Sequence, residues 1–89
     1  MAISVKEPRS GNDTVGGYPW LARMIDKARL EAAGTIDQLD LEYPCPMDQR
    51  LLAQLKVDPK TFQAIVVHAA NNTEIIEALS QAGVHFPGK

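Results

Sequence analysis

The chain has 89 residues, of which 45% are hydrophobic and 22% charged, a balance typical of one small folded domain rather than a disordered chain. Nine Lys and Arg against 11 Asp and Glu give a net charge of −2, which disfavours a partner such as DNA or RNA. The sequence contains no apolar run of membrane-spanning length, no signal-peptide core and only one cysteine, and so predicts a protein of the reducing cytoplasm with no membrane partner.

The N-terminal segment, residues 1–15, is predicted to be an extended arm that is ordered only where it docks. It is polar, and Pro8 and Gly11 favour turns and extended backbone. The rest of the chain, residues 16–89, is predicted to form a single helical domain.

The first helix is predicted to begin at Pro19 or Trp20 and to end at Gly34. Gly16 and Gly17 allow a sharp approach, and proline suits a first helical turn because its missing N–H has no partner there. At about 100° per residue the apolar face holds Trp20, Leu21, Met24, Ile25, Ala28 and Ala32. The opposite, solvated face is expected to hold Arg23, Asp26, Lys27 and Glu31.

Leu30 does not fit this pattern, because it falls on the polar face between Arg23 and Asp26. It is therefore an interface candidate. One explanation is a homodimer, since a small domain gains stability from burial against a second copy. The other is cover by Ile3 or Val5 of the N-terminal arm.

An irregular extended connector is predicted over residues 35–46, where a short apolar alternation ends at Pro44 and Pro46. A second helix is predicted over 47–56, with Asp48 near its start, where an acid favours the helix dipole.

Two more helices are marked by their caps. Asp58 precedes Pro59, a pair typical of a helix start, and Asn71 with Glu74 resembles a capping box. Gly83 is expected to end the last helix.

The predicted fold class is all-α, a small compact bundle of about four short helices. The tail beyond the last helix contains two apolar residues, Val84 and Phe86, which we expect to fold back onto the core.

Cys45 is the first candidate for chemistry, and two interpretations stay open. It is a nucleophilic or redox thiol activated by the helix start that follows and by Arg50, or it is a small structural residue. The structural interpretation is favoured, since free cysteine is among the most buried residue types and no histidine or second cysteine is near in sequence.

Charged residues near two helix starts form the second group of candidates. The binding candidates are Tyr18, Arg23, Asp26, Lys27, Cys45, Asp48, Gln49 and Arg50. If the first two helices cross, the Arg23/Asp26/Asp48/Arg50 group could converge on an anionic ligand. A structural ion-pair network would give the same pattern and is favoured. The Tyr18 hydroxyl needs a partner if it is buried.

Neither a metal nor a cofactor is expected. His68 and His85 are isolated, and no spacing typical of metal ligands occurs. The glycines before the first helix are not followed by a phosphate-binding pattern, and Pro19 removes a backbone donor there.

Four blocks of sequence carry a family resemblance: "PRS" at 8–10, "DTVGGYPWLARMIDKAR" at 13–29, "GT" at 34–35 and "CPMDQR" at 45–50. In their order and spacing they resemble the DUF5069 family, small bacterial proteins of unassigned function. The resemblance spans nearly the whole chain and implies no mechanism.

Two functions remain open. The favoured one is a cytoplasmic binding or interaction module for an unknown protein or a small anionic ligand. The alternative is a small enzyme that acts on an anionic metabolite through Cys45 or through the Arg23/Asp26/Asp48/Arg50 group.

Overall fold

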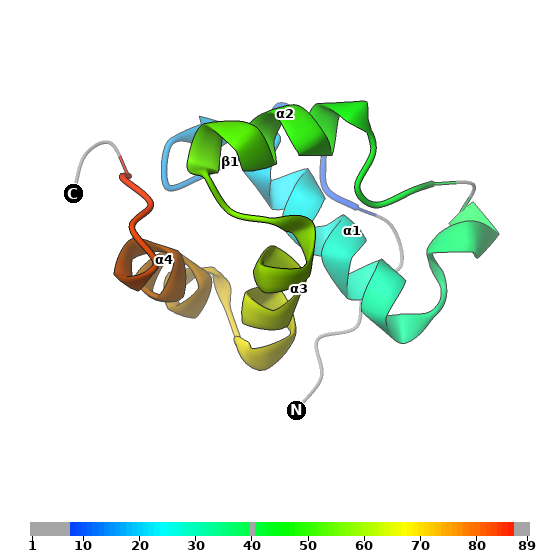
Figure 1. Cartoon of the computed structure of the whole chain (residues 1–89). Coiled ribbons are helices and arrows are strands. Elements are labelled where there is room, and N and C mark those ends of the chain that lie inside the picture. Colours follow the sequence, from blue (N-terminus) through cyan, green and yellow to red (C-terminus); the bar gives the residue numbers. More distant parts are fainter. Residues whose placement is uncertain (1–7, 40, 87–89) are drawn as a thin grey trace.

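Four α-helices, one 3₁₀ helix and a short hairpin make up the computed structural model, which describes residues 8–39 and 41–86 (Figure 1). The elements are β1 (Thr14–Val15), β2 (Tyr18–Pro19), α1 (Leu21–Ala33), η1 (Ile36–Leu39), α2 (Pro46–Leu55), α3 (Pro59–His68) and α4 (Asn72–Gln81). The predicted helical bundle is confirmed, although the hairpin means that the fold is not strictly all-α. Within the described ranges, no helix combines the length and the apolar character that crossing a membrane requires.

The hairpin begins inside the segment predicted to be an arm. β1 and β2 pair antiparallel with Val15 opposite Tyr18, and the two-residue turn between them is Gly16–Gly17. Both glycines have positive φ, 61° and 89°, as the tight turn of a twisted hairpin requires. A Cβ on Gly16 would also collide with the ring of Phe86, so only glycine fits there. Val15 is buried, and the end of the predicted arm therefore contributes to the core.

α1 begins at Leu21, slightly later than predicted, because Pro19 belongs to β2. Trp20 is the residue before the helix and has a left-handed backbone, with φ of 74°, which is uncommon for a large side chain. Its backbone N–H donates to the Gly11 carbonyl at 2.9 Å. A Cβ on Gly11 would lie 2.5 Å from the indole, so glycine allows the two segments to touch.

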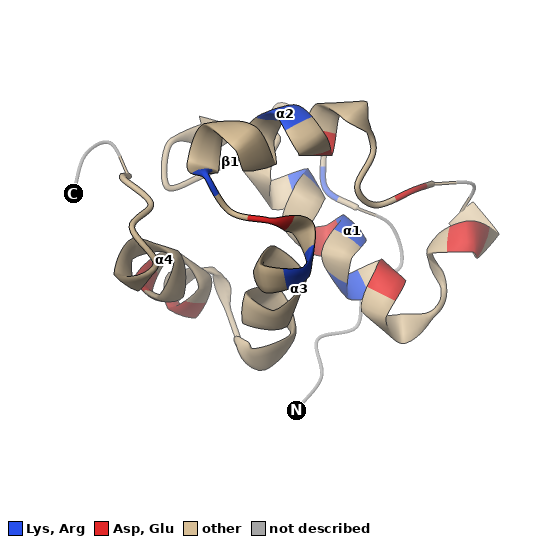
Figure 2. Ribbon diagram, in the orientation of Figure 1, with Lys and Arg blue, Asp and Glu red and all other residues tan. Residues whose placement is uncertain are grey.

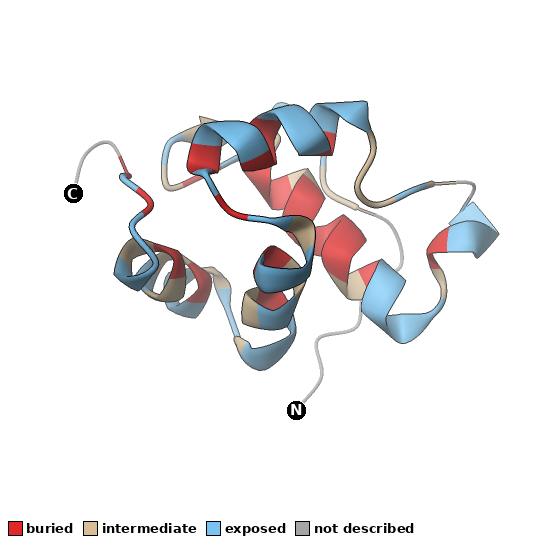
Figure 3. Ribbon diagram, in the orientation of Figure 1, coloured by how far each residue is buried: buried red, intermediate tan, exposed pale blue. Residues whose placement is uncertain are grey.

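α1 is the central element of the fold and packs mainly against α3. Figure 3 shows buried residues along most of α1 and exposure at its C-terminal end. Ala32 lies in that exposed end, so its predicted place on the apolar face is wrong. The side chains with no exposed surface in the core are Leu21, Met24, Ile25, Ala28, Phe62, Val66, Ile75 and Leu79.

The C-terminal end of α1 forms as predicted at Gly34, whose φ is 75°. The Thr35 N–H donates to the Leu30 carbonyl at 3.0 Å, which satisfies a carbonyl that the helix leaves free. Leu30 is 2% exposed within a single chain, so its side chain has no surface to offer a second copy. The residues proposed to cover it, Ile3 and Val5, lie outside the described residues. Self-association stays a prediction.

The connector contains the 3₁₀ helix η1, which the sequence analysis did not predict. The caps of α3 and α4 are confirmed: the Asp58 carboxylate accepts from the Thr61 N–H at 3.2 Å, and the Asn71 side chain accepts from the Glu74 N–H at 2.9 Å. The box at α4 is shifted by one residue, because Glu74 accepts from the N–H of Ala70.

The C-terminal tail folds back as predicted, with Val84 and Phe86 both buried. The Tyr18 hydroxyl donates to the His85 carbonyl at 2.6 Å, and the Tyr18 ring meets Phe86 edge-on with 5.6 Å between centroids. The predicted partner for this hydroxyl is therefore a backbone carbonyl of the tail, which ties the tail to the hairpin.

Candidate functional site

A buried ion pair, Lys27–Asp48, joins α1 to α2. Lys27 Nζ lies 2.7 Å from Asp48 Oδ2, and the two side chains are 3% and 0% exposed. The other carboxylate oxygen, Oδ1, accepts from Trp20 Nε1 at 2.7 Å, and Oδ2 also accepts from the Cys45 backbone N–H at 3.0 Å. These hydrogen-bond donors replace the water that burial removes from the carboxylate, and they therefore stabilise it in the buried position.

The start of α2 explains why Asp48 turns inward. Cys45 is the residue before the helix, Pro46 takes the first position and Asp48 the third. The Asp48 carboxylate accepts from the Cys45 N–H while the Cys45 thiol accepts from the Asp48 N–H, which is a capping box with a thiol in place of the usual hydroxyl. This geometry also places Cys45 Sγ 3.0 Å from Lys27 Nζ.

A second ion pair, Arg9–Asp26, lies on the neighbouring side of α1. Arg9 donates to Asp26 Oδ2 from Nε at 2.8 Å and from its backbone N–H at 2.9 Å, and to Oδ1 from Nη2 at 3.1 Å. The side chains are 34% and 7% exposed. Arg29 lies 3.9 Å from the same carboxylate, and burial lowers the pKa of its guanidinium although Asp26 opposes the shift. This cluster docks the N-terminal segment on α1.

These two clusters correct the prediction that Asp26 and Lys27 lie on a solvated face, since both are buried. Figure 2 shows acidic and basic residues along α1, most of which is buried in Figure 3. A helix face that is charged in sequence can be buried when each charge meets an opposite partner.

The four residues that the sequence suggested as one group form no ion pair with one another, although Arg23, Asp48 and Arg50 all lie around Trp20. Asp26 pairs with Arg9, whereas Asp48 pairs with Lys27. Arg50 is exposed on α2. What the structure brings together instead is Lys27, Asp48 and the Cys45 thiol, three candidates that the sequence analysis had placed in separate clusters.

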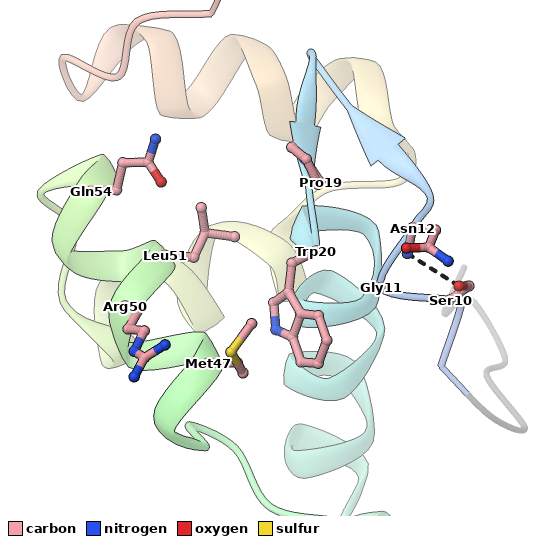
Figure 4. A pocket seen from close by; sticks show the side chains of 9 residues that line it. All are labelled: Ser10, Gly11, Asn12, Pro19, Trp20, Met47, Arg50, Leu51 and Gln54. Carbon is pink, nitrogen blue, oxygen red and sulfur yellow. Dashed lines mark hydrogen bonds between the residues drawn. The ribbon is translucent and has the colours of Figure 1, made fainter.

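A hollow of about 580 Å³ lies between α2 and the segment that leads into α1. We call it the Trp20 hollow, and its lining residues are Ser10, Gly11, Asn12, Pro19, Trp20, Met47, Arg50, Leu51 and Gln54. In Figure 4 the α2 side chains Met47 and Leu51 lie across from the indole, with Arg50 beyond them. Among the described lining residues, Arg50 alone carries a charge.

Trp20 connects the hollow to the buried pair. Its ring lines the hollow while its Nε1 donates to Asp48. Two cations lie over the same ring, with Arg23 Cζ at 5.5 Å and Lys27 Nζ at 6.0 Å from its centroid. The sequence predicts Trp20 on the apolar face of the first helix, but the residue is only half-buried. No local signal in the sequence marks its contact with Asp48, because the two residues are 28 positions apart.

The remaining candidates make local contacts. The Gln49 amide donates to the Pro44 carbonyl at 3.2 Å. Tyr43, which the sequence analysis did not single out, donates to the Pro59 carbonyl at 2.8 Å, and burial, with Asp48 and Asp58, raises the pKa of its hydroxyl. In the part of the chain that the structure describes, no three His, Cys, Asp or Glu residues gather as metal ligands would.

No curated protein sequence matches the chain. A family model described as a domain of unknown function matches residues 5–85, a range that contains the hairpin, all four α-helices and both ion pairs. The chain therefore belongs to the DUF5069 family.

Proposed function

We propose that this protein is a binding module and that the Trp20 hollow is its ligand site. The observation that carries the proposal is a hollow of about 580 Å³ with mainly apolar walls, one indole ring and one arginine. Binding sites for small molecules are commonly of about 300–1,000 Å³, and their apolar walls hold a few polar groups that orient the ligand.

The lining favours a small ligand with a flat apolar body and an anionic group. The Trp20 ring, with Met47 and Leu51, offers apolar and stacking surface. The Arg50 guanidinium is exposed and suits a carboxylate or phosphate, to which it can donate two parallel hydrogen bonds. Asp48 lies near but does not repel an anion, because Lys27 neutralises it.

Preorganisation of the indole supports the same proposal. The ring is held by its Nε1 bond to Asp48 and by the backbone bond from Trp20 to Gly11. A wall fixed before binding loses less conformational freedom when the ligand arrives, which favours affinity. A left-handed backbone at a large residue is also a feature that folds retain at functional positions.

The test uses the single tryptophan, Trp20, as a fluorescent reporter. The probes are anilinonaphthalene sulfonate, which is flat, apolar and anionic, and phenylnaphthylamine, its uncharged analogue. We expect quenching of Trp20 by the anionic probe, and Arg50→Gln should weaken this binding about tenfold, or roughly 1.4 kcal/mol. The uncharged probe should bind wild type and Arg50→Gln alike.

The matched control is Lys60→Gln, which removes one exposed cation from α3 outside the Trp20 hollow. It should leave the affinity for the anionic probe unchanged. Equal weakening by both variants would mean that net charge alone attracts the probe, and the proposed site would be withdrawn. Absence of any Trp20 quenching at saturating probe would also contradict it.

We further propose a cytoplasmic location. The support is a single cysteine with no partner for an internal disulfide. Fractionation of the source cells with an antibody against the protein tests this, and recovery outside the cytoplasm would overturn it.

A further inference from the structure

The contact between Lys27 and Cys45 is not used by the proposed binding function. Lys27 Nζ lies 3.0 Å from Cys45 Sγ, and the lysine side chain is 3% exposed. Cys45 as a residue is half-buried, it is followed by the exposed Pro46 and Met47, and its thiol contacts the buried pair. A lysine nitrogen is thus held against an oxidisable sulfur at the junction of α1 and α2, with a carboxylate beside it that can take its proton.

We propose that Lys27 and Cys45 form an oxidation-dependent covalent link, a sulfenamide, when a peroxide reaches Cys45. The link joins Sγ to Nζ and ties the start of α2 to the middle of α1. The modification site is this pair of side chains, and the co-reactant is hydrogen peroxide.

The first step is oxidation of the thiol. The Cys45 sulfur attacks one peroxide oxygen, the S–O bond forms and the O–O bond breaks, so that thiol and hydrogen peroxide give sulfenic acid and water. Sulfur loses two electrons and the peroxide gains them. No other cysteine in the chain can then take up the sulfenic acid as an internal disulfide.

The second step is condensation without further oxidant. Lys27 passes one proton to Asp48 Oδ2, which lies 2.7 Å from Nζ. The freed lone pair attacks Sγ, the S–O bond breaks, and hydroxide leaves with a second proton from nitrogen as water. The products are an S–N bond, one water and a neutral Asp48 carboxyl. Sulfenic acids are known to condense with a nearby nitrogen in this way.

The contacts around the pair favour capture over further oxidation. Asp48 keeps two other donors, Trp20 Nε1 and the Cys45 N–H, after it receives the proton, so its position is held. Nζ already lies in hydrogen-bond contact with the sulfur. Condensation therefore needs a short approach of two held groups, whereas a second oxidation needs a second peroxide molecule.

The experiment is intact-mass measurement of the native protein after treatment with hydrogen peroxide. The sulfenamide predicts a product about 2 Da lighter than the reduced chain, reversed by dithiothreitol. Trypsin should release residues 24–29 joined to residues 30–50, because cleavage after the modified Lys27 is blocked. The same treatment in urea should give no such link, since the pair is held together only in the fold.

Products about 16 or 32 Da heavier at Cys45, with no joined peptides, would overturn the proposal, as would a disulfide-linked pair of chains. A chain unchanged by peroxide would overturn it too. A joined product about 14 Da heavier would show that oxygen stays in the bridge, and would overturn the sulfenamide.

Substitutions test whether Cys45 Sγ and Lys27 Nζ are the two atoms that form the bond. Cys45→Ser and Lys27→Met should each abolish the lighter product. The control is Lys60→Met, which replaces an exposed lysine of α3 and should form the lighter product as wild type does. Circular dichroism reports whether Lys27→Met is folded. The native and urea arms of the wild-type experiment decide the question if it is not.

Discussion

Asp26 and Lys27 are consecutive residues of α1, yet their ion pairs differ in partner and burial. Asp26 binds Arg9 of the N-terminal segment, and that arginine keeps contact with water. Lys27 binds Asp48 at the start of α2, and neither side chain has appreciable exposure. Because successive helical residues point about 100° apart, one turn of α1 serves two clusters in two environments.

The difference shows that the charged residues of α1 stabilise this small fold through two kinds of ion pair, one partly exposed and one buried. The Arg9–Asp26 pair docks a segment, including Ser10 and Asn12 of the Trp20 hollow. The Lys27–Asp48 pair holds α1 against the start of α2, and Asp48 also holds the Trp20 indole through the hydrogen bond from Nε1. Salt should weaken the first pair more than the second, because only exposed charges are well screened.

The largest effect is expected for Asp48→Ala. This change leaves the Lys27 ammonium buried without its counter-charge and removes the acceptor of Trp20 Nε1. Breaking one partner of a buried pair costs about 3–5 kcal/mol. We expect a loss of that size in the free energy of unfolding, measured by urea denaturation with Trp20 fluorescence.

A double variant, Lys27→Met with Asp48→Leu, is the control for this prediction. It replaces both charges by apolar side chains, and we expect it to recover most of the loss, because two apolar groups need no charge partner. Two outcomes would contradict a buried pair. One is a double variant whose loss in the free energy of unfolding equals the sum of the losses of the two single variants. The other is a loss below about 1 kcal/mol in Asp48→Ala.

A smaller effect is expected for Arg9→Ala. The change removes charged hydrogen bonds to Asp26, which are worth about 1.5–3 kcal/mol when buried and less here because Arg9 is partly exposed. The loss should shrink when the urea series is repeated at high salt. A salt-independent loss as large as that of Asp48→Ala would remove the contrast between the two pairs.

The smallest effect is expected at Asp58, an exposed cap that forms no ion pair with any residue of 8–39 or 41–86. Hydrogen bonds from the Thr61 hydroxyl and N–H hold the pKa of this carboxyl below its ordinary value. Its contribution is therefore present above the ordinary pKa of about 3.9 and is lost as the pH falls through the lowered value of the folded state. Wild type and Asp58→Ala should differ at neutral pH and converge in acid. Parallel curves at every pH would contradict this cause.

Much of the fold follows from local signals. Gly34, the Asp58–Pro59 pair and Asn71 mark helix ends whose hydrogen bonds are short-range, so the sequence alone predicts the end of α1 and the starts of α3 and α4. The hairpin also had a local signal, since two glycines between Val15 and Tyr18 are typical of a two-residue turn. Proline is also typical of a first helical turn, and Pro19 therefore predicted a helix start where the structure has the second strand of the hairpin.

The candidate site follows much less from the sequence. Nothing local indicates that Asp26 and Lys27 are buried, because that depends on where α2 and the N-terminal segment pack against α1. Lys27, Cys45 and Asp48 were each candidates, but their contact joins positions far apart in the chain. The role of Trp20 likewise depends on Asp48, 28 residues further along the chain.

The most direct measurement is hydrogen exchange of the Trp20 indole N–H, observed by NMR in a protein with a single tryptophan. Our interpretation is that the Asp48 carboxylate accepts a hydrogen bond from this N–H in an environment shielded from water, and that the Lys27 ammonium holds the carboxylate in place. It predicts one indole signal that persists long after transfer to deuterium oxide, and fast exchange in the folded double variant Lys27→Met with Asp48→Leu, which has no acceptor at position 48. An indole signal that disappears at once in the wild type would contradict it.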